Sequence, residues 1–194
     1  MVKLALRPEE SFRSVNMTRK WDVLEVLKHY RHDWLNKLQL IKGNLDIGRT
    51  EKAATLIDEI IQQSRNESHL SNMNIPDLAT RLITFNWEEH PYLLTVETIT
   101  GDKDWSQHES EIKTFLDDMF LLFDKYANYG DDNHIILIFK DLKEFKIELD
   151  FQGELPLNST LEREIQQLKN KFGNILGKIE WDKHGCFINL NLSN

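Results

Sequence analysis

The sequence predicts an α+β protein in which an N-terminal helical hairpin is followed by an α/β sandwich. Apolar residues recur every three or four positions over residues 21–47 and again over 50–64, which is the spacing of one face of a helix. Polar residues gather over 70–76 and indicate a boundary. After this boundary, strand-like apolar runs alternate with helical segments. We therefore expect two domains, residues 1–73 and residues 74–194.

The first domain is predicted to be an antiparallel pair of helices. An apolar stripe follows the first helix: Leu27, Tyr30, Trp34, Leu38, Ile41 and Leu45. Gly48 indicates the turn, and Thr50 can cap the second helix. The second stripe consists of apolar or small residues: Ala53, Ala54, Ile57, Ile60, Ile61 and Ser64. Because two helices cannot cover both stripes alone, we expect a homodimer that forms a four-helix bundle. The alternative is that the C-terminal half folds back over the stripes.

The second domain is predicted to pack helices against a mostly antiparallel sheet. Pro76 suits the first turn of a helix that runs to Phe85. The other expected elements are strands over 92–100, 135–139, 145–151, 179–181 and 187–192, and helices over 110–129 and 161–172. Three tryptophans are predicted to be core residues: Trp34, Trp87 and Trp181.

The composition excludes several classes of protein. The 194 residues carry a formal net charge of -8, which argues against non-specific binding to nucleic acid or to an anionic membrane. The single cysteine, Cys186, allows no internal disulfide and indicates a reducing compartment. The first ten residues lack an apolar run of signal-peptide length, and no later run approaches ~18 apolar residues. The histidines show no metal-ligand spacing. We expect a cytoplasmic protein without a metal site of its own.

His32 is the candidate for chemistry. At about 100° per residue, His32 falls nearly opposite the first apolar stripe and should face water. Asn36 and Gln39 lie within about one turn on the same side, and Leu35 and Leu40 flank that side. Imidazole titrates near neutral pH, and its neutral form is a nucleophile. From spacing alone, His32 is either a nucleophile that a partner protein can reach or an ordinary solvated histidine.

Two parts of the chain resemble known families. Residues 30–45, YRHDWLNKLQLIKGNL, resemble the phosphoacceptor helix of the stage zero sporulation protein B family of sporulation initiation phosphotransferases. They resemble more loosely the H-D-x-x-N dimerisation helix of citrate-type sensor histidine kinases. The blocks ESHLSN at 67–72 and LITFNW at 82–87 are similar to the same sporulation family. The resemblance is specific from about Tyr30 to Trp87 and is architectural beyond that.

The resemblance implies a histidine phosphotransferase of a phosphorelay. His32 would take a phosphoryl group from the aspartate of a phosphorylated single-domain response regulator. It would then pass the group to the receiver domain of a sporulation transcription regulator, without ATP. Mg²⁺ would belong to the regulator's acidic pocket. Asp33 would orient the imidazole, or is simply a surface acid. The residues expected to meet the regulators surround His32: Arg31, Leu35, Asn36, Lys37, Gln39, Leu40 and Lys42.

The order of elements in the second domain resembles that of a histidine-kinase ATP-binding domain, but the nucleotide motifs are degenerate. The N-x-x-x-N signature falls near Phe120 and Asp124, which lack the metal-chelating asparagine. The D-x-G-x-G signature is reduced to DFQGE at 150–154, and the glycine-rich lid is reduced to Gly173, Asn174 and Gly177. We expect a kinase-like domain without nucleotide chemistry. Two alternatives remain open: a sensor-type histidine autokinase that uses ATP, and a non-catalytic adaptor that binds a response regulator.

Overall fold

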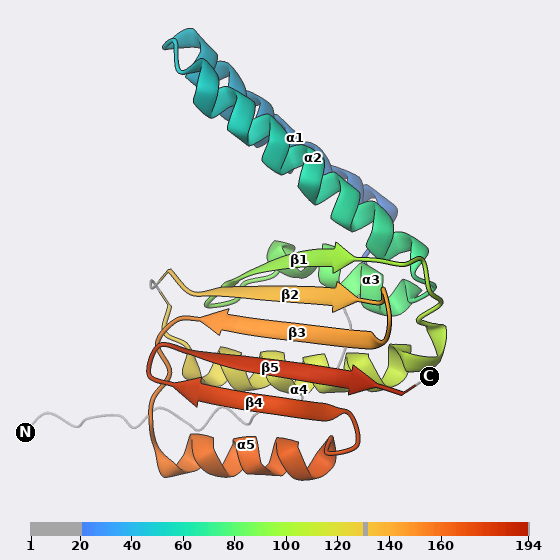
Figure 1. Ribbon diagram of the computed structural model, residues 1–194. Helices are drawn as coiled ribbons and strands as arrows, with labels where there is room; N and C mark the ends of the chain where they lie inside the picture. Colours follow the sequence, from blue (N-terminus) through green and yellow to red (C-terminus); the bar gives the residue numbers. More distant parts are fainter. Residues whose placement is uncertain (1–20, 130–131, 194) are drawn as a thin grey trace, which may run out of the picture.

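A long helical hairpin projects from an α/β domain (Figure 1). The computed structural model describes residues 21–129 and 132–193, and the first ten residues, for which we expected no signal segment, lie outside this part. The hairpin consists of α1 (Val23–Asp46) and α2 (Thr50–Asn72). The predicted α+β class is confirmed.

A tight turn at Gly48 connects the two helices of the hairpin. Gly48 has φ +76°, a conformation that glycine adopts without a steric penalty. The Arg49 amide donates to the Asn44 carbonyl at 2.8 Å, so backbone hydrogen bonds close the turn. Thr50 is already the first residue of α2, and Arg49 precedes it without a side-chain cap. The prediction that Thr50 caps the helix is therefore wrong, because the Gly48 turn leads directly into helical backbone.

The α/β domain is built on a five-stranded sheet with the order β1-β2-β3-β5-β4. Its strands are β1 (Leu93–Ile99), β2 (His134–Lys140), β3 (Phe145–Gln152), β4 (Leu176–Asp182) and β5 (Gly185–Leu192). β1 is parallel to β2, and every other neighbouring pair is antiparallel. β4 is longer than the predicted 179–181, because pairing with β5 extends it across a register shift between Leu176 and Lys178.

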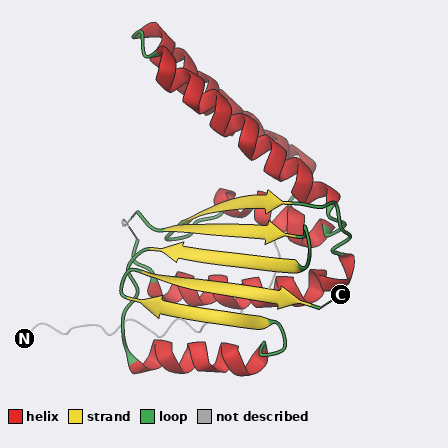
Figure 2. Ribbon diagram, in the orientation of Figure 1, coloured by secondary structure: helices red, strands yellow, loops and turns green. Residues whose placement is uncertain are grey.

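The domain also contains these helices: α3 (Pro76–Ile83), η1 (Phe85–Trp87), η2 (Ser106–His108), α4 (Glu109–Tyr126) and α5 (Ser159–Lys171). α4 lies behind the sheet, with α5 beside it (Figure 2). The inner side of the sheet is apolar, because alternate residues of β2 and β3 are buried against the helices. Trp181 packs against this core, and Cys186 is buried in it. Trp34 and Trp87 are only partly buried and lie outside it.

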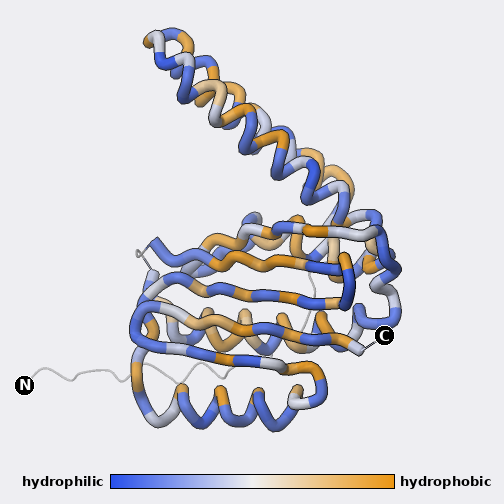
Figure 3. Tube along the Cα trace, in the orientation of Figure 1, coloured by the Kyte–Doolittle hydropathy of each residue, from blue (hydrophilic) through white to orange (hydrophobic). Residues whose placement is uncertain are grey.

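Hydrophobic residues also recur along the hairpin, where the α/β domain does not cover them (Figure 3). Leu38 and Leu45 of the first stripe are 53% and 51% exposed, and Ile57 and Ile61 of the second are 43% and 44% exposed. The structure therefore contradicts the alternative that the C-terminal half folds back over the stripes. Apolar surface of this length remains available to another chain.

Candidate functional site

His32 lies in the middle of α1 with its side chain 73% exposed. The sequence places it opposite the apolar stripe, and the structure agrees. The amide Nδ2 of Asn36, one turn along the helix, lies 3.3 Å from His32 Nδ1. Among the described residues, nothing is hydrogen-bonded to His32 Nε2. One nitrogen of the imidazole is thus held by its own helix, and the other faces solvent.

Asp33 lies beside the imidazole and is turned partly toward the α/β domain. Its Oδ1 is 3.6 Å from His32 Nδ1. Its other oxygen, Oδ2, accepts a hydrogen bond of 2.9 Å from Nε1 of Trp87. Because a hydrogen bond to a charged acceptor is stronger than a neutral one, the indole can fix the orientation of the carboxylate. Asp33 therefore lies between the phosphoacceptor candidate and the second domain.

Trp87 belongs to an aromatic cluster at the base of the hairpin. Its ring stacks on His29 with centroids 5.3 Å apart and an interplanar angle of 17°. Trp21 meets both rings edge-on, at 5.2 Å from His29 and 5.3 Å from Trp87. We predicted Trp87 as a core residue, and the structure instead places it against α1. The LITFNW block contains Trp87, but no spacing in the sequence connects position 87 with position 33.

A second group of contacts holds α2 against the edge of the sheet. Asn66 is buried, and its Oδ1 accepts from the backbone amide of Thr98 at 3.3 Å and from the Thr98 hydroxyl at 3.2 Å. His69 Nδ1 lies 3.0 Å from the same hydroxyl. These contacts and the aromatic cluster attach both helices of the hairpin to the α/β domain.

Most of the residues expected to meet a regulator surround His32 on the surface. Arg31, Leu35, Asn36, Gln39 and Leu40 are exposed. The other two expected residues are engaged within the hairpin. The Lys37 ammonium donates to Gln63 of α2 at 2.8 Å. The Lys42 ammonium pairs with Asp46 at 2.5 Å.

The residues at two positions of the degenerate N-x-x-x-N motif contact other residues of the same domain. Phe120 is 2% exposed and belongs to the core. Asp124 Oδ1 lies 2.8 Å from Nδ1 of His90, whose ring stacks on Phe85 with centroids 4.1 Å apart. Burial, with the Asp124 charge as a smaller cause, raises the pKa of the neighbouring Tyr92 hydroxyl well above its usual range.

Two of the remaining glycines of those motifs, Gly153 and Gly177, lie where a side chain would not fit. A Cβ at Gly153 would collide with the Asn133 side chain, and one at Gly177 would collide with Asn189 and Asn191. α5 ends at Lys171 and β4 begins at Leu176, so the connection that corresponds to the lid is short.

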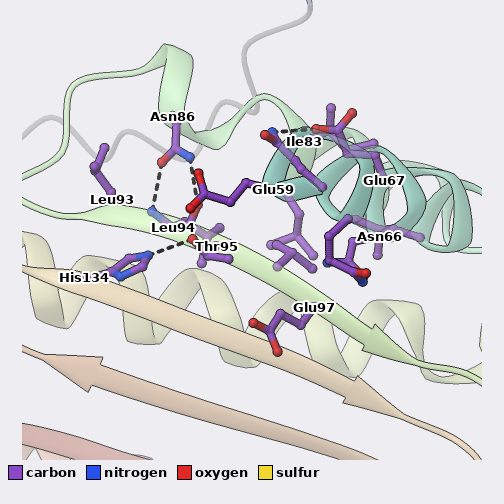
Figure 4. Close-up of a pocket in the computed structure, with 15 residues that line it drawn as sticks. Glu59, Asn66, Glu67, Ile83, Asn86, Leu93, Leu94, Thr95, Glu97 and His134 are labelled. Atoms are coloured by element: carbon purple, nitrogen blue, oxygen red, sulfur yellow. Dashed lines mark hydrogen bonds between the residues drawn. The ribbon is translucent and has the colours of Figure 1, made fainter. Parts of the chain in front are cut away.

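A groove of about 700 Å³ lies between α2 and β1 (Figure 4). Three glutamates line it, Glu59 and Glu67 from α2 and Glu97 from β1. At one side Asn86 exchanges two hydrogen bonds with the backbone of Leu94, at 2.8 and 2.9 Å. The groove does not include His32. In the described part of the chain, no three acidic, histidine or cysteine side chains form a possible metal site. No described helix is long and apolar enough to cross a membrane.

Comparisons with known proteins cover almost the whole chain. Residues 16–73 match the alpha-helical domain of the SpoOB-type sensor kinase family, and residues 74–193 match the C-terminal domain of sporulation initiation phospho-transferase B. The sporulation initiation phosphotransferase B of Bacillus subtilis (strain 168) is 30% identical over 195 residues, covering 99% of this chain and all of that protein. The chain therefore belongs to the sporulation initiation phosphotransferase B family.

Solved structures of histidine kinases are also similar to the chain. The blue-light activated histidine kinase of Erythrobacter litoralis EL346 aligns with a TM-score of 0.44 and 12% identity, over 91% of this chain and 61% of that one. Histidine kinase ThkA, solved in complex with response regulator protein TrrA, aligns with a TM-score of 0.36 and 14% identity, over 87% of this chain and 60% of that one. The chain thus spans about three fifths of the length of these two kinase chains.

Proposed function

We propose that the chain is a phosphorelay histidine phosphotransferase with His32 as the phosphoacceptor. It takes the phosphoryl group from the aspartate of a single-domain response regulator and passes it to the receiver domain of a sporulation transcription regulator. The observation that carries the proposal is the exposed His32 imidazole, with Nε2 facing solvent, on a chain of the phosphotransferase family. Its partners are cytoplasmic regulators, so we place the chain in the cytoplasm.

The chemistry needs no nucleotide. A lone pair of the neutral imidazole attacks the phosphorus of the aspartyl phosphate, a P–N bond forms, and the P–O bond to the aspartate breaks. The aspartate leaves as a carboxylate, and the ring proton can pass to solvent. The second transfer reverses these changes on the other regulator. The acyl phosphate and the phosphohistidine are both energetic, so no further energy source is needed. Positioning and a Mg²⁺ ion are then the main requirements.

We place the Mg²⁺ in the regulator's acidic pocket. Near His32, the carboxylate closest to the imidazole is that of Asp33, and one of its oxygens is occupied by Trp87. Mg²⁺ prefers several oxygen ligands and retained waters, so this surface does not suit a resident ion. The ion therefore arrives with the receiver.

A regulator would dock on the exposed side chains around His32. Arg31 and the amides of Asn36 and Gln39 suit phosphate and the acidic rim of a receiver, and Leu35 and Leu40 add apolar contact. The apolar stripes on the opposite side favour a homodimer, since a second hairpin would bury residues such as Leu38 that are now exposed. A four-helix bundle of this kind leaves both copies of His32 facing outward.

Transfer from a phosphorylated receiver tests the proposal. A purified single-domain receiver is labelled with ³²P and mixed with the wild type, with His32→Ala, and with His184→Ala as a control in an exposed turn. We expect label on the wild type and on the control, and none on His32→Ala. Label on His32→Ala would contradict the assignment. Binding without any transfer would favour the adaptor, and labelling from ATP alone would favour the autokinase.

A further inference from the structure

We propose that Trp87 is a positioning residue for phosphoryl transfer at His32, and that it links the α/β domain to the phosphoacceptor through Asp33. This inference rests on the proposed function. It extends that function to the second domain, which does not contain His32. The carrying observation is the 2.9 Å hydrogen bond from the indole of Trp87 to Asp33 Oδ2.

The hydrogen bond determines which oxygen of Asp33 faces the imidazole. With Oδ2 held by the indole, Oδ1 remains 3.6 Å from His32 Nδ1. The Asp33 side chain is 46% exposed, so without the indole both of its oxygens can hydrate and its terminal torsion can turn freely. The distance from the carboxylate to the imidazole would then no longer be defined.

The indole itself is held in place by rings and by the sheet. His29 stacks on one face of Trp87, and Trp21 meets it edge-on. The preceding residue, Asn86, is tied to Leu94 of β1 by two hydrogen bonds. A continuous series of contacts therefore runs from the edge strand, through Asn86 and Trp87, to Asp33 and the phosphoacceptor.

The chain contains a second tryptophan–aspartate hydrogen bond that provides a matched control. Trp105 Nε1 donates to Asp141 Oδ2 at 3.0 Å inside the core, and Trp105 is completely buried. Trp87 is only partly buried and lies outside the core cluster. Replacing either tryptophan by phenylalanine removes an indole donor and keeps an aromatic ring. Only the Trp87 substitution removes a contact beside His32.

The experiment measures transfer from a ³²P-labelled single-domain receiver to full-length Trp87→Phe, Trp105→Phe, Asp33→Ala and the Trp87→Phe/Asp33→Ala double variant. We expect Trp87→Phe to lower the transfer rate at saturating receiver about tenfold, part of the roughly hundredfold loss that a 1 Å displacement can cause. The receiver concentration for half-maximal rate should not change. Trp105→Phe should lower the melting temperature and leave transfer at 25 °C unchanged.

The double variant separates positioning from general destabilisation. If Trp87 acts through Asp33, adding Trp87→Phe to Asp33→Ala should cause no further loss. Additive losses, or a wild-type rate in Trp87→Phe, would overturn the inference. The indole N–H signal of Trp87 in a ¹H–¹⁵N spectrum should move in Asp33→Ala, and an unmoved signal would also overturn it. Failure of the proposed function is a different result, namely undiminished labelling of His32→Ala.

Discussion

His32 and Asp33 are neighbours in the chain but have different surroundings. His32 is largely exposed, whereas Asp33 is bound to Trp87 of the α/β domain. Adjacent residues on a helix point about 100° apart, so one side chain faces solvent while the next faces the domain. At the residue scale, the candidate site combines an accessible imidazole with a neighbouring carboxylate that is hydrogen-bonded to the α/β domain.

Cys186 allows a test of the interior of the domain. Burial, with the charge of Asp150 as a smaller cause, raises the pKa of its thiol to about 12. The reactive thiolate is therefore scarce at pH 8. We expect iodoacetamide at pH 8 to leave Cys186 unmodified in the native protein and to modify it fully in 6 M guanidinium chloride, as read by intact mass. Equally fast labelling of the native protein would contradict the buried position.

At the scale of elements, the two glycines of the hairpin should respond oppositely to alanine. Gly43 lies inside α1 with open space around it, so Gly43→Ala should raise the free energy of unfolding by about 0.5–1 kcal/mol. Gly48 has φ +76°, so Gly48→Ala should lower it by about 1–2 kcal/mol. Urea unfolding curves give both values. Equal effects of the two substitutions would mean that the turn does not need a left-handed residue.

The apolar stripe of α1 leads to a prediction about association. Leu38→Asn would place an unpaired amide inside a four-helix bundle and should destabilise the dimer by about 2–5 kcal/mol per subunit. Leu40→Asn, a position outside the stripe, is the matched control and should leave the dimer intact. Light scattering at micromolar concentration gives the mass. A wild-type monomer under these conditions would refute the bundle.

At the scale of the whole molecule, the α/β domain is attached to both helices of the hairpin. Trp87 contacts α1 through Asp33 and His29, and Thr98 contacts α2 through Asn66 and His69. Of the degenerate nucleotide positions, Phe120 is buried in the core and Asp124 is in contact with His90. The contacts to α1 and α2 are those expected of a domain that holds the helical hairpin in position.

We therefore predict that the molecule does not bind Mg-ATP. A ligand at a hundredfold excess over its dissociation constant stabilises the folded state by about 2.7 kcal/mol, which would raise the melting temperature by several degrees. We expect millimolar Mg-ATP to leave the melting temperature where Mg²⁺ alone leaves it. A rise of several degrees, or γ-phosphate on His32 without a regulator, would identify an autokinase.

Local patterns predicted most of the elements, and the errors have physical causes. The expected helix over 21–47 is observed as Val23–Asp46, because its apolar spacing is regular. The expected strand over 135–139 is β2, His134–Lys140. β4 was predicted too short, since it contains polar residues and Gly177 and extends only by pairing with β5.

By itself, the sequence determined the helical hairpin, the outward position of His32 and the apolar stripes, because helical geometry repeats every 3.6 residues and relates only near neighbours. The tertiary structure alone decided that Trp87 meets Asp33, 54 positions away. That contact depends on how η1 docks against α1, and the docking follows from the packing of the whole domain. No local periodicity encodes the direction in which a partly buried tryptophan points.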